Sequence, residues 1–301
     1  MEGEATVVYN VFHEPPLGLP IAIYFYMTGL SAGSFIMSTL AYGFGIKRYK
    51  PLGKVGVVLA TLLLVMAPLN LIIDLGQPLR FWHLFPYLQA TSPITYGSFL
   101  LTLYPLNCLV YGAFMFAGNM RLTTMFGRIG IPLAISVHGY TGFILALAKA
   151  RALWNTALMP MYFLISTMVS GIALMMLVVV IKSRFFTPER KVNRELAFDL
   201  GRMLAWTIVL DLFLVLSDVL VLLTADSEAR EAAMLILTGK FSPYFLGVEL
   251  LAGSLIPVLL LLLPFTARRL PAMLVSSVLA MIGVFAMRYV MVIGGQSVPL
   301  S

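Results

Sequence analysis

Charged residues are scarce in this chain of 301 residues. Asp, Glu, Lys and Arg make up 11% of the sequence and hydrophobic residues 60%, whereas a soluble domain carries about 25% charged residues. The charged residues are therefore too few to cover a water-facing surface. Apolar residues come in blocks of about twenty, the length that a helix needs to cross the hydrocarbon core of a bilayer. The sequence lacks the short segments of alternating polarity that a transmembrane barrel needs, so we predict an all-α integral membrane protein.

Cysteine is almost missing as well, since Cys108 stands alone within an apolar segment. One thiol can form neither an internal disulfide nor an iron–sulfur site, which takes about four cysteines. Of the three histidines, only His138 lies well inside an apolar block, while His13 and His83 lie near its edges. A membrane haem held by two histidines needs both of them inside the bundle. We therefore expect no haem and no iron–sulfur cluster in this chain, and no metal site, because clustered ligands are lacking.

The apolar blocks predict about eight membrane-spanning helices within a single membrane domain, residues 1–301. They lie at Pro16–Gly45, Val55–Ile73, Ile94–Gly118, Ile129–Ala148, Ala157–Ile181, Arg202–Thr224, Pro243–Pro264 and Ala272–Ile293.

The distribution of basic residues predicts how these helices are oriented. Lys and Arg collect in cytoplasmic loops, and here they are dense at 47–54 and 182–202, after the first and fifth spans. Both termini are therefore expected on the non-cytoplasmic side of a bacterial or archaeal cytoplasmic membrane. The acidic start, Met1-Glu2-Gly3-Glu4, does not resemble the positive region that opens a signal peptide. The net charge of +7 follows this topology, so we expect membrane lipids as partners and no nucleic acid.

The two halves of the chain, 16–148 and 157–293, show signs of an internal repeat. Such a repeat would make two four-helix bundles in parallel, and many transporters bind substrate between repeats. Chance matches in apolar sequence are the alternative. Four pairs match at one offset of 138 residues: Tyr24/Tyr162, Phe25/Phe163, Gly33/Gly171 and Met37/Met175.

Four ionisable residues fall inside the last three expected spans: Asp211, Asp218, Glu249 and Arg288. Ionisable groups in a bilayer are costly and are usually paired or functional. Asp211 and Asp218 share one helix face, and Asp218, Glu249 and Arg288 share roughly one depth. The four residues, with His138, are candidates either for structural ion pairs that tie helices together or for a proton path.

Polar residues also stand near the non-cytoplasmic ends of the early spans. Asn10 and His13 precede the first span and Asp74 ends the second, while Tyr140 lies near the end of the fourth. Each has an ordinary interpretation: a solvated tail for Asn10 and His13, a surface ion pair with Arg80 for Asp74, and a tyrosine without a special role for Tyr140. The functional interpretation is a partner-docking site or a quinone entrance.

In their order along the chain, several short motifs resemble those of the NrfD/PsrC family, the membrane subunits of polysulfide reductase-like complexes. The resemblance spans nearly the whole chain. The motifs are Leu19-Pro20, Tyr24-Phe25, Gly29-Leu30-Ser31-Ala32-Gly33, Asp74-Leu75-Gly76 with Pro78, Arg80-Phe81-Trp82, Tyr140-Thr141-Gly142, Leu153-Trp154-Asn155-Thr156 and Gly294-Gly295-Gln296.

The resemblance implies a quinone-reactive membrane anchor without haem. Such a subunit passes electrons between a quinone pool, menaquinone or ubiquinone, and an iron–sulfur electron-transfer subunit with a molybdopterin catalytic subunit on the outer face. Carried over by motif, Asn10 and His13, spaced as Asn-x-x-His, and Tyr140 match quinone-contacting positions, with Asp74 as a weaker match. The resemblance names neither the substrate of the soluble partner nor the direction of electron flow.

Two other functions remain open from the residues alone. A secondary transporter would use the intramembrane residues Asp211, Asp218, Glu249 and Arg288, and the possible repeat favours it. A passive anchor would bind no quinone at all. Uptake of a solute by the isolated protein would distinguish the transporter from the electron-transfer subunit.

Overall fold

The computed structural model describes residues 17–89, 91–182 and 194–297, and these ranges are helical, without a strand. Eight helical segments are long and apolar enough to cross a membrane, as predicted. The segments are α1 (Leu19–Tyr42), α2 (Lys50–Asp74), α3 (Pro93–Phe116), α4 (Met120–Ala146), α5 (Met159–Ile181), α6 (Arg194–Thr224), η4 (Pro243–Leu255) continued by α8 (Ile256–Leu262), and α9 (Leu270–Tyr289) continued by η5 (Val290–Gly294). The short elements between them are η1 (Lys47–Tyr49), η2 (Pro78–Leu84) and α7 (Ser227–Leu237).

Two helices begin well before the spans predicted for them. α4 begins at Met120 rather than near 129, and α6 begins at Arg194 rather than near 202. The prediction followed the apolar residues, but a helix does not end where the hydrocarbon ends. At α4 the side chain of Asn119 accepts a hydrogen bond from the Leu122 N–H at 3.2 Å, which caps a polar first turn.

α7 lies between two predicted spans, in a segment for which no helix was expected. Asp226 caps it by accepting a hydrogen bond from the Ala229 N–H at 2.9 Å. One of its faces is apolar, with Ala229, Ala232 and Ile236 buried. With 11 residues, α7 is too short to cross a membrane and packs against the bundle instead.

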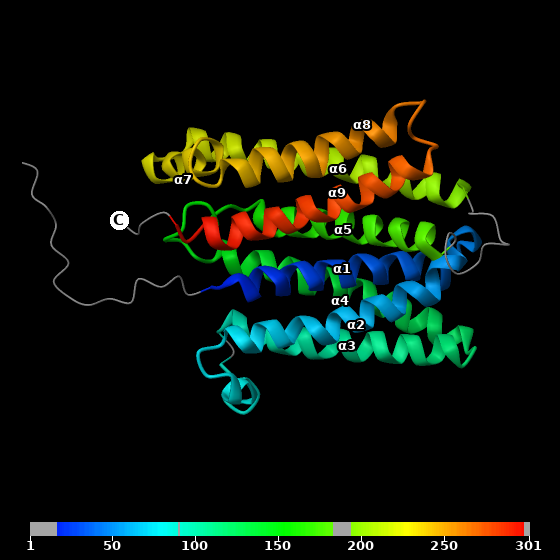
Figure 1. Cartoon of the computed structure of the whole chain (residues 1–301). Coiled ribbons are helices and arrows are strands. Elements are labelled where there is room, and N and C mark those ends of the chain that lie inside the picture. Colours follow the sequence, from blue (N-terminus) through cyan, green and yellow to red (C-terminus); the bar gives the residue numbers. More distant parts are fainter. Residues whose placement is uncertain (1–16, 90, 183–193, 298–301) are drawn as a thin grey trace, which may run out of the picture.

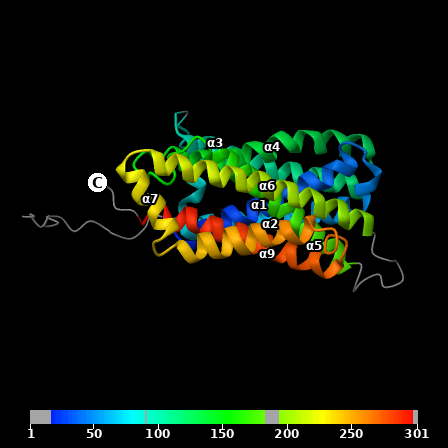
Figure 2. The ribbon, with the colours of Figure 1, turned by 90° about the horizontal axis from the view of Figure 1, so that it is seen from above.

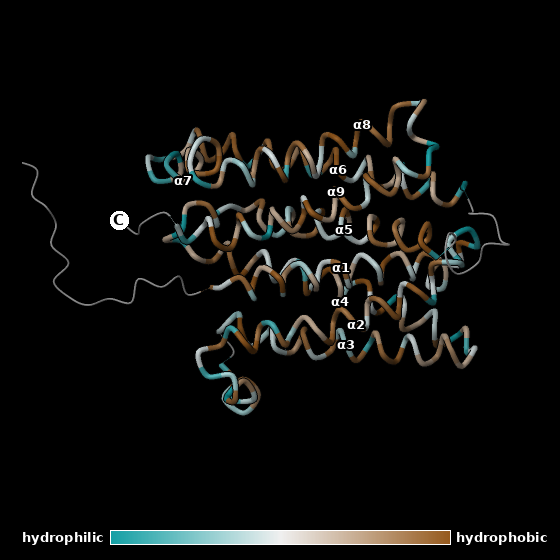
Figure 3. The backbone as a smooth tube through the Cα atoms, viewed as in Figure 1, coloured by the Kyte–Doolittle hydropathy of each residue, from teal (hydrophilic) through white to brown (hydrophobic). Residues whose placement is uncertain are grey.

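The long helices lie side by side and nearly parallel (Figure 1). α1 and α5 occupy the middle, α2 and α3 form one edge, and α6 and α8 form the other, and the view from above agrees (Figure 2). Hydrophobic residues cover the length of the bundle, while hydrophilic residues gather at its two ends (Figure 3). The described chain starts and finishes at the same end (Figure 1), which we call the terminal end. That this end faces outward remains a prediction.

Positions that match at the offset of 138 residues contact each other where α1 crosses α5. The rings of Phe25 and Phe163 meet edge to face with centroids 5.4 Å apart. Gly33 and Gly171 lie backbone to backbone one helix turn or more further along. In a two-fold arrangement, residues on the axis contact their own equivalents. These contacts support the predicted internal repeat, which remains a prediction.

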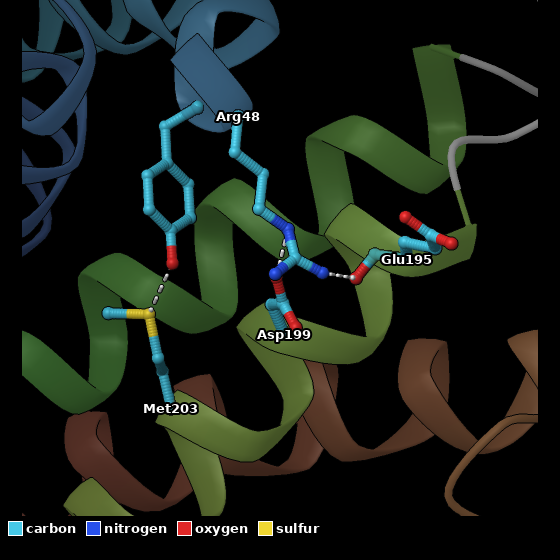
Figure 4. Close-up of polar contacts among 5 residues, drawn as sticks. Arg48, Glu195, Asp199 and Met203 are labelled. Carbon is cyan, nitrogen blue, oxygen red and sulfur yellow. Dashed lines mark hydrogen bonds and ion pairs between the residues drawn. The ribbon is translucent and has the colours of Figure 1, made fainter. Parts of the chain in front are cut away.

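At the opposite end of the bundle, the loop after α1 is attached to α6 (Figure 4). Arg48 forms an ion pair with Asp199 and donates a hydrogen bond to the Glu195 carbonyl oxygen at 3.4 Å. The Tyr49 hydroxyl lies 3.4 Å from the sulfur of Met203. These contacts join the first half of the chain to the second at this end.

The seventh span is wound as a π-helix over the 13 residues of η4. π-Helical segments are rare and often mark functional sites. The wider winding places Ser254 so that its hydroxyl donates to the Glu249 carbonyl oxygen, five residues earlier, at 3.0 Å. Gly253 meets Gly283 of α9 backbone to backbone, and this close approach brings the Glu249 side of η4 toward α9.

Candidate functional site

Asp74 holds the start of α1 at the terminal end. It ends α2, and its Oδ2 accepts a hydrogen bond from the backbone N–H of Gly18 at 3.2 Å. Gly18 precedes α1, and a side chain at this position would collide with the Asp74 carboxyl. Within the described residues Asp74 therefore bonds to Gly18 rather than to Arg80. Asn10 and His13 precede this point and lie outside the described residues.

Tyr140 lies on α4, about two helix turns from its terminal end. Its ring fills the space left by Gly97 of α3, where even a Cβ atom would overlap the ring. Tyr24 of α1 lies within electrostatic reach of Tyr140. The Tyr140 side chain is half-buried, and in the described part of the chain no group forms a hydrogen bond with its hydroxyl. Three helices therefore position a hydroxyl that is free to bind another molecule.

His138 lies two residues before Tyr140 and is 1% exposed. Its Nδ1 is 2.8 Å from the Ala134 carbonyl oxygen, so the ordinary interpretation of a buried, satisfied histidine accounts for one ring nitrogen. The other nitrogen, Nε2, is buried and has no hydrogen-bond partner among the described residues. Thr28 of α1 lies beside the ring, and its hydroxyl donates to the Tyr24 carbonyl oxygen at 2.9 Å.

Motifs far apart in the sequence meet at the terminal end. The Trp154 indole N–H donates to the Met291 carbonyl oxygen at 2.5 Å. The Arg151 guanidinium donates to the Gln296 carbonyl oxygen at 3.1 Å. The Gln296 side chain bonds to both the N–H and the carbonyl of Leu17, each at 2.9 Å. The fold therefore brings together the motifs around Leu19, Asp74, Trp154 and Gln296.

A second group of polar side chains is buried among the helices of the second half. Arg288 of α9 is 1% exposed, and its Nη2 donates to the Phe163 carbonyl oxygen at 3.1 Å and to the Ser166 hydroxyl at 2.8 Å. The guanidinium carbon lies 3.7 Å from the centre of the Phe163 ring. The Nε and Nη1 groups of Arg288 have no hydrogen-bond partner among the described residues.

The three intramembrane acids surround this region, as their shared depth predicted. Glu249 of η4 accepts a hydrogen bond from the Tyr162 hydroxyl through Oε1, and Asp211 and Glu249 lie within electrostatic reach of Arg288. Asp218 lies beside Thr156. All three acids are buried. Among the described residues, the structure places no three His, Cys, Asp or Glu side chains where they could hold a metal ion.

Two contributors to this group were not expected from the sequence: Tyr162 and Ser166 of α5. The only signal was indirect, because Tyr162 is the repeat counterpart of Tyr24 but carries no other mark of a site residue. Arg288 bonds to α5 and not directly to an acid. The structure thus brings the predicted residues Asp211, Glu249 and Arg288 together without a direct ion pair.

Comparison with known proteins places these motifs in a family. The sequence model described as "Polysulphide reductase, NrfD" matches residues 8–299. The C subunit of the selenate reductase of Mesobacillus selenatarsenatis is 29% identical, over 94% of this chain and 74% of its own length. The Hdr-like menaquinol oxidoreductase integral membrane subunit of Archaeoglobus fulgidus is 30% identical, over 94% of this chain and 72% of its own length. The C component of the polysulfide reductase of Wolinella succinogenes is 26% identical, over 92% and 93%.

Proposed function

Because this chain belongs to the NrfD family, we propose that it is the quinone-reactive membrane subunit of an oxidoreductase complex. In this role it passes electrons between the membrane quinone pool and an iron–sulfur and molybdopterin module on the outer face. Two relatives are named as parts of reductases and one as a membrane subunit of a menaquinol oxidoreductase. Their names describe those proteins, and the same role is proposed for this chain.

The observation that carries the proposal is the unpaired Tyr140 hydroxyl near the terminal end. A quinone supplies a carbonyl oxygen that accepts a hydrogen bond, and it takes up or releases protons when it is reduced or oxidised. Tyr140 would donate that hydrogen bond, and Gly97 leaves the room its ring needs. Asp74 would keep the start of α1 in place, and with it the preceding Asn10 and His13, which complete the proposed site.

The surface near this site fits a position at the membrane interface. The short helix η2 stands out from the terminal end (Figure 1). It exposes Leu79, Phe81 and Trp82, at 89%, 42% and 52% of their surface. Aromatic residues favour the headgroup layer. A site just below this layer would lie close to a soluble partner that docks on the same face.

The secondary transporter is the second candidate function. Its proposed residues, Asp211, Glu249 and Arg288, do gather inside the second half of the chain. The names of the relatives favour the electron-transfer subunit, because all three refer to oxidoreductases.

Purification in mild detergent, with identification of bound subunits and extracted quinone, tests the proposal. We expect iron–sulfur and molybdopterin subunits to remain bound, together with a quinone. A chain that purifies without partners or quinone would contradict the proposal. Uptake of a solute by that lone protein in liposomes would then establish the transporter.

A further inference from the structure

The group around Arg288 contains more buried polar atoms than the protein itself satisfies. Asp211, Asp218, Glu249 and Arg288 are 7%, 5%, 4% and 1% exposed. One oxygen of each acid and two nitrogens of the arginine have no hydrogen-bond partner among the described residues. Buried polar groups are nearly always paired with protein or water. Unpaired atoms from three helices are therefore typical of a group that binds internal water.

The charges in this group do not balance if every acid is ionised. Three carboxyls, those of Asp211, Asp218 and Glu249, face one guanidinium, that of Arg288. Two negative charges would then remain uncompensated inside the hydrocarbon layer, where a charge is costly. Binding a proton removes this cost more readily than moving a helix does. The Tyr162 hydroxyl donates to Glu249, which adds no positive charge.

A line of polar groups leads from this group toward the terminal end. His138 of α4 lies within electrostatic reach of Arg288, and its buried Nε2 is unpaired among the described residues. Thr28 lies beside His138 and bonds to the Tyr24 carbonyl oxygen. Tyr24 in turn lies within reach of Tyr140. The groups between the acids and the proposed quinone site therefore come from α1, α4 and α9.

We propose that Asp211, Asp218, Glu249 and Arg288 form a hydrated site that stores an exchangeable proton, and that His138 connects this site to the terminal end. On release, the O–H bond of a protonated carboxyl breaks and a water molecule takes the proton, leaving a carboxylate that faces Arg288. Uptake is the reverse step. The link to quinone chemistry rests on the proposed function, but the storage of a proton does not.

Infrared spectroscopy of the purified full-length protein in lipid nanodiscs, without added quinone, tests the storage site. A protonated carboxyl has its own carbonyl-stretch band. We expect this band in the wild type, and we expect Glu249→Gln to remove or shift it. Asp199→Asn is the control, since that acid forms an ion pair with Arg48 at the opposite end. If Glu249→Gln does not fold, Asp211→Asn and Asp218→Asn test the same site.

The overturning result is a wild type without a protonated carboxyl band, or a band that survives replacement of each of the three acids. The role of His138 is tested by transfer into heavy water. We expect His138→Leu to slow the deuterium shift of the band roughly tenfold, the effect of raising a barrier by about 1.4 kcal/mol. Thr28→Val replaces it if that variant does not fold. An unchanged exchange rate would reject the connection. Failure of quinone binding would leave both results standing.

Discussion

Gly33 of α1 and Gly171 of α5 lie backbone against backbone in the middle of the bundle, at positions that match between the two halves of the chain. A Cβ atom on Gly33 would come within 2.7 Å of the Thr167 carbonyl oxygen and 2.5 Å of the Gly171 Cα. Small residues allow this approach, which is a common way for helices to pack in membranes. The contact sets the distance between α1 and α5, and the two halves pack against each other through these helices.

Gly33→Val should therefore destabilise the protein, because the added methyl groups meet backbone that cannot move aside. Overpacking of this kind costs about 1–3 kcal/mol. The measurement is the thermal unfolding midpoint in detergent. Gly139→Val is the matched control, since a Cβ at Gly139 would meet nothing within 4 Å. Equal midpoints for the two variants would show that the glycine contact does not limit the packing.

Tyr140→Phe should lower quinone-linked turnover while the complex still assembles. The substitution removes one hydroxyl and keeps the ring that packs at Gly97. Loss of a hydrogen bond worth about 1.5 kcal/mol corresponds to roughly a tenfold loss. Turnover of the purified complex with a soluble quinol measures it. Tyr87→Phe is the control, because Tyr87 is 76% exposed and lies outside the proposed site.

His13→Ala provides a second test of the same site. His13 lies outside the described residues, and its role rests on the resemblance of Asn10 and His13 to the family motif. We expect its loss to reduce quinone turnover without loss of assembly. Normal turnover in both Tyr140→Phe and His13→Ala would remove the site from the terminal end.

Trp154→Phe should loosen the loop at 149–158 from the end of the last span. The change keeps an aromatic ring but removes the indole N–H that bonds to the Met291 carbonyl oxygen at 2.5 Å. A buried carbonyl left without its partner costs about 1–3 kcal/mol. The unfolding midpoint and the rate of protease cleavage in this loop measure the effect. Cleavage at the wild-type rate would indicate that Arg151 and Gln296 hold the loop without Trp154.

The ion pair between Arg48 and Asp199 (Figure 4) should contribute little to stability. The Arg48 side chain is 48% exposed, and exposed pairs are worth about 0–1 kcal/mol. A double-mutant cycle with Arg48→Ala and Asp199→Ala measures the coupling energy, which should fall further in high salt. A larger coupling that resists salt would show that the pair is shielded from solvent in the membrane.

Much of the fold follows from the sequence because hydrophobicity and length act locally. A block of about twenty apolar residues has few alternatives to a helix, since each backbone polar group must be bonded inside the bilayer. The starts of α4 and α6 were placed too late, because the start of a helix depends on caps and polar turns that apolar patterns do not record. Asp211, Glu249 and Arg288 are unusual from the sequence alone, because each puts a charge into an apolar block.

The sequence by itself determined that the protein has about eight membrane-spanning helices, that the charges in its last three spans are exceptional, and that its motifs resemble one family. The tertiary structure alone decided which of these residues meet. It placed Arg288 against the backbone of Phe163 rather than against an acid, and Trp154 against the last span. The physical reason is that contacts between helices depend on crossing points and on local winding. The approach of Gly33 to Gly171 and the π-helix around Glu249 set those contacts, and neither can be derived from hydrophobicity along the sequence.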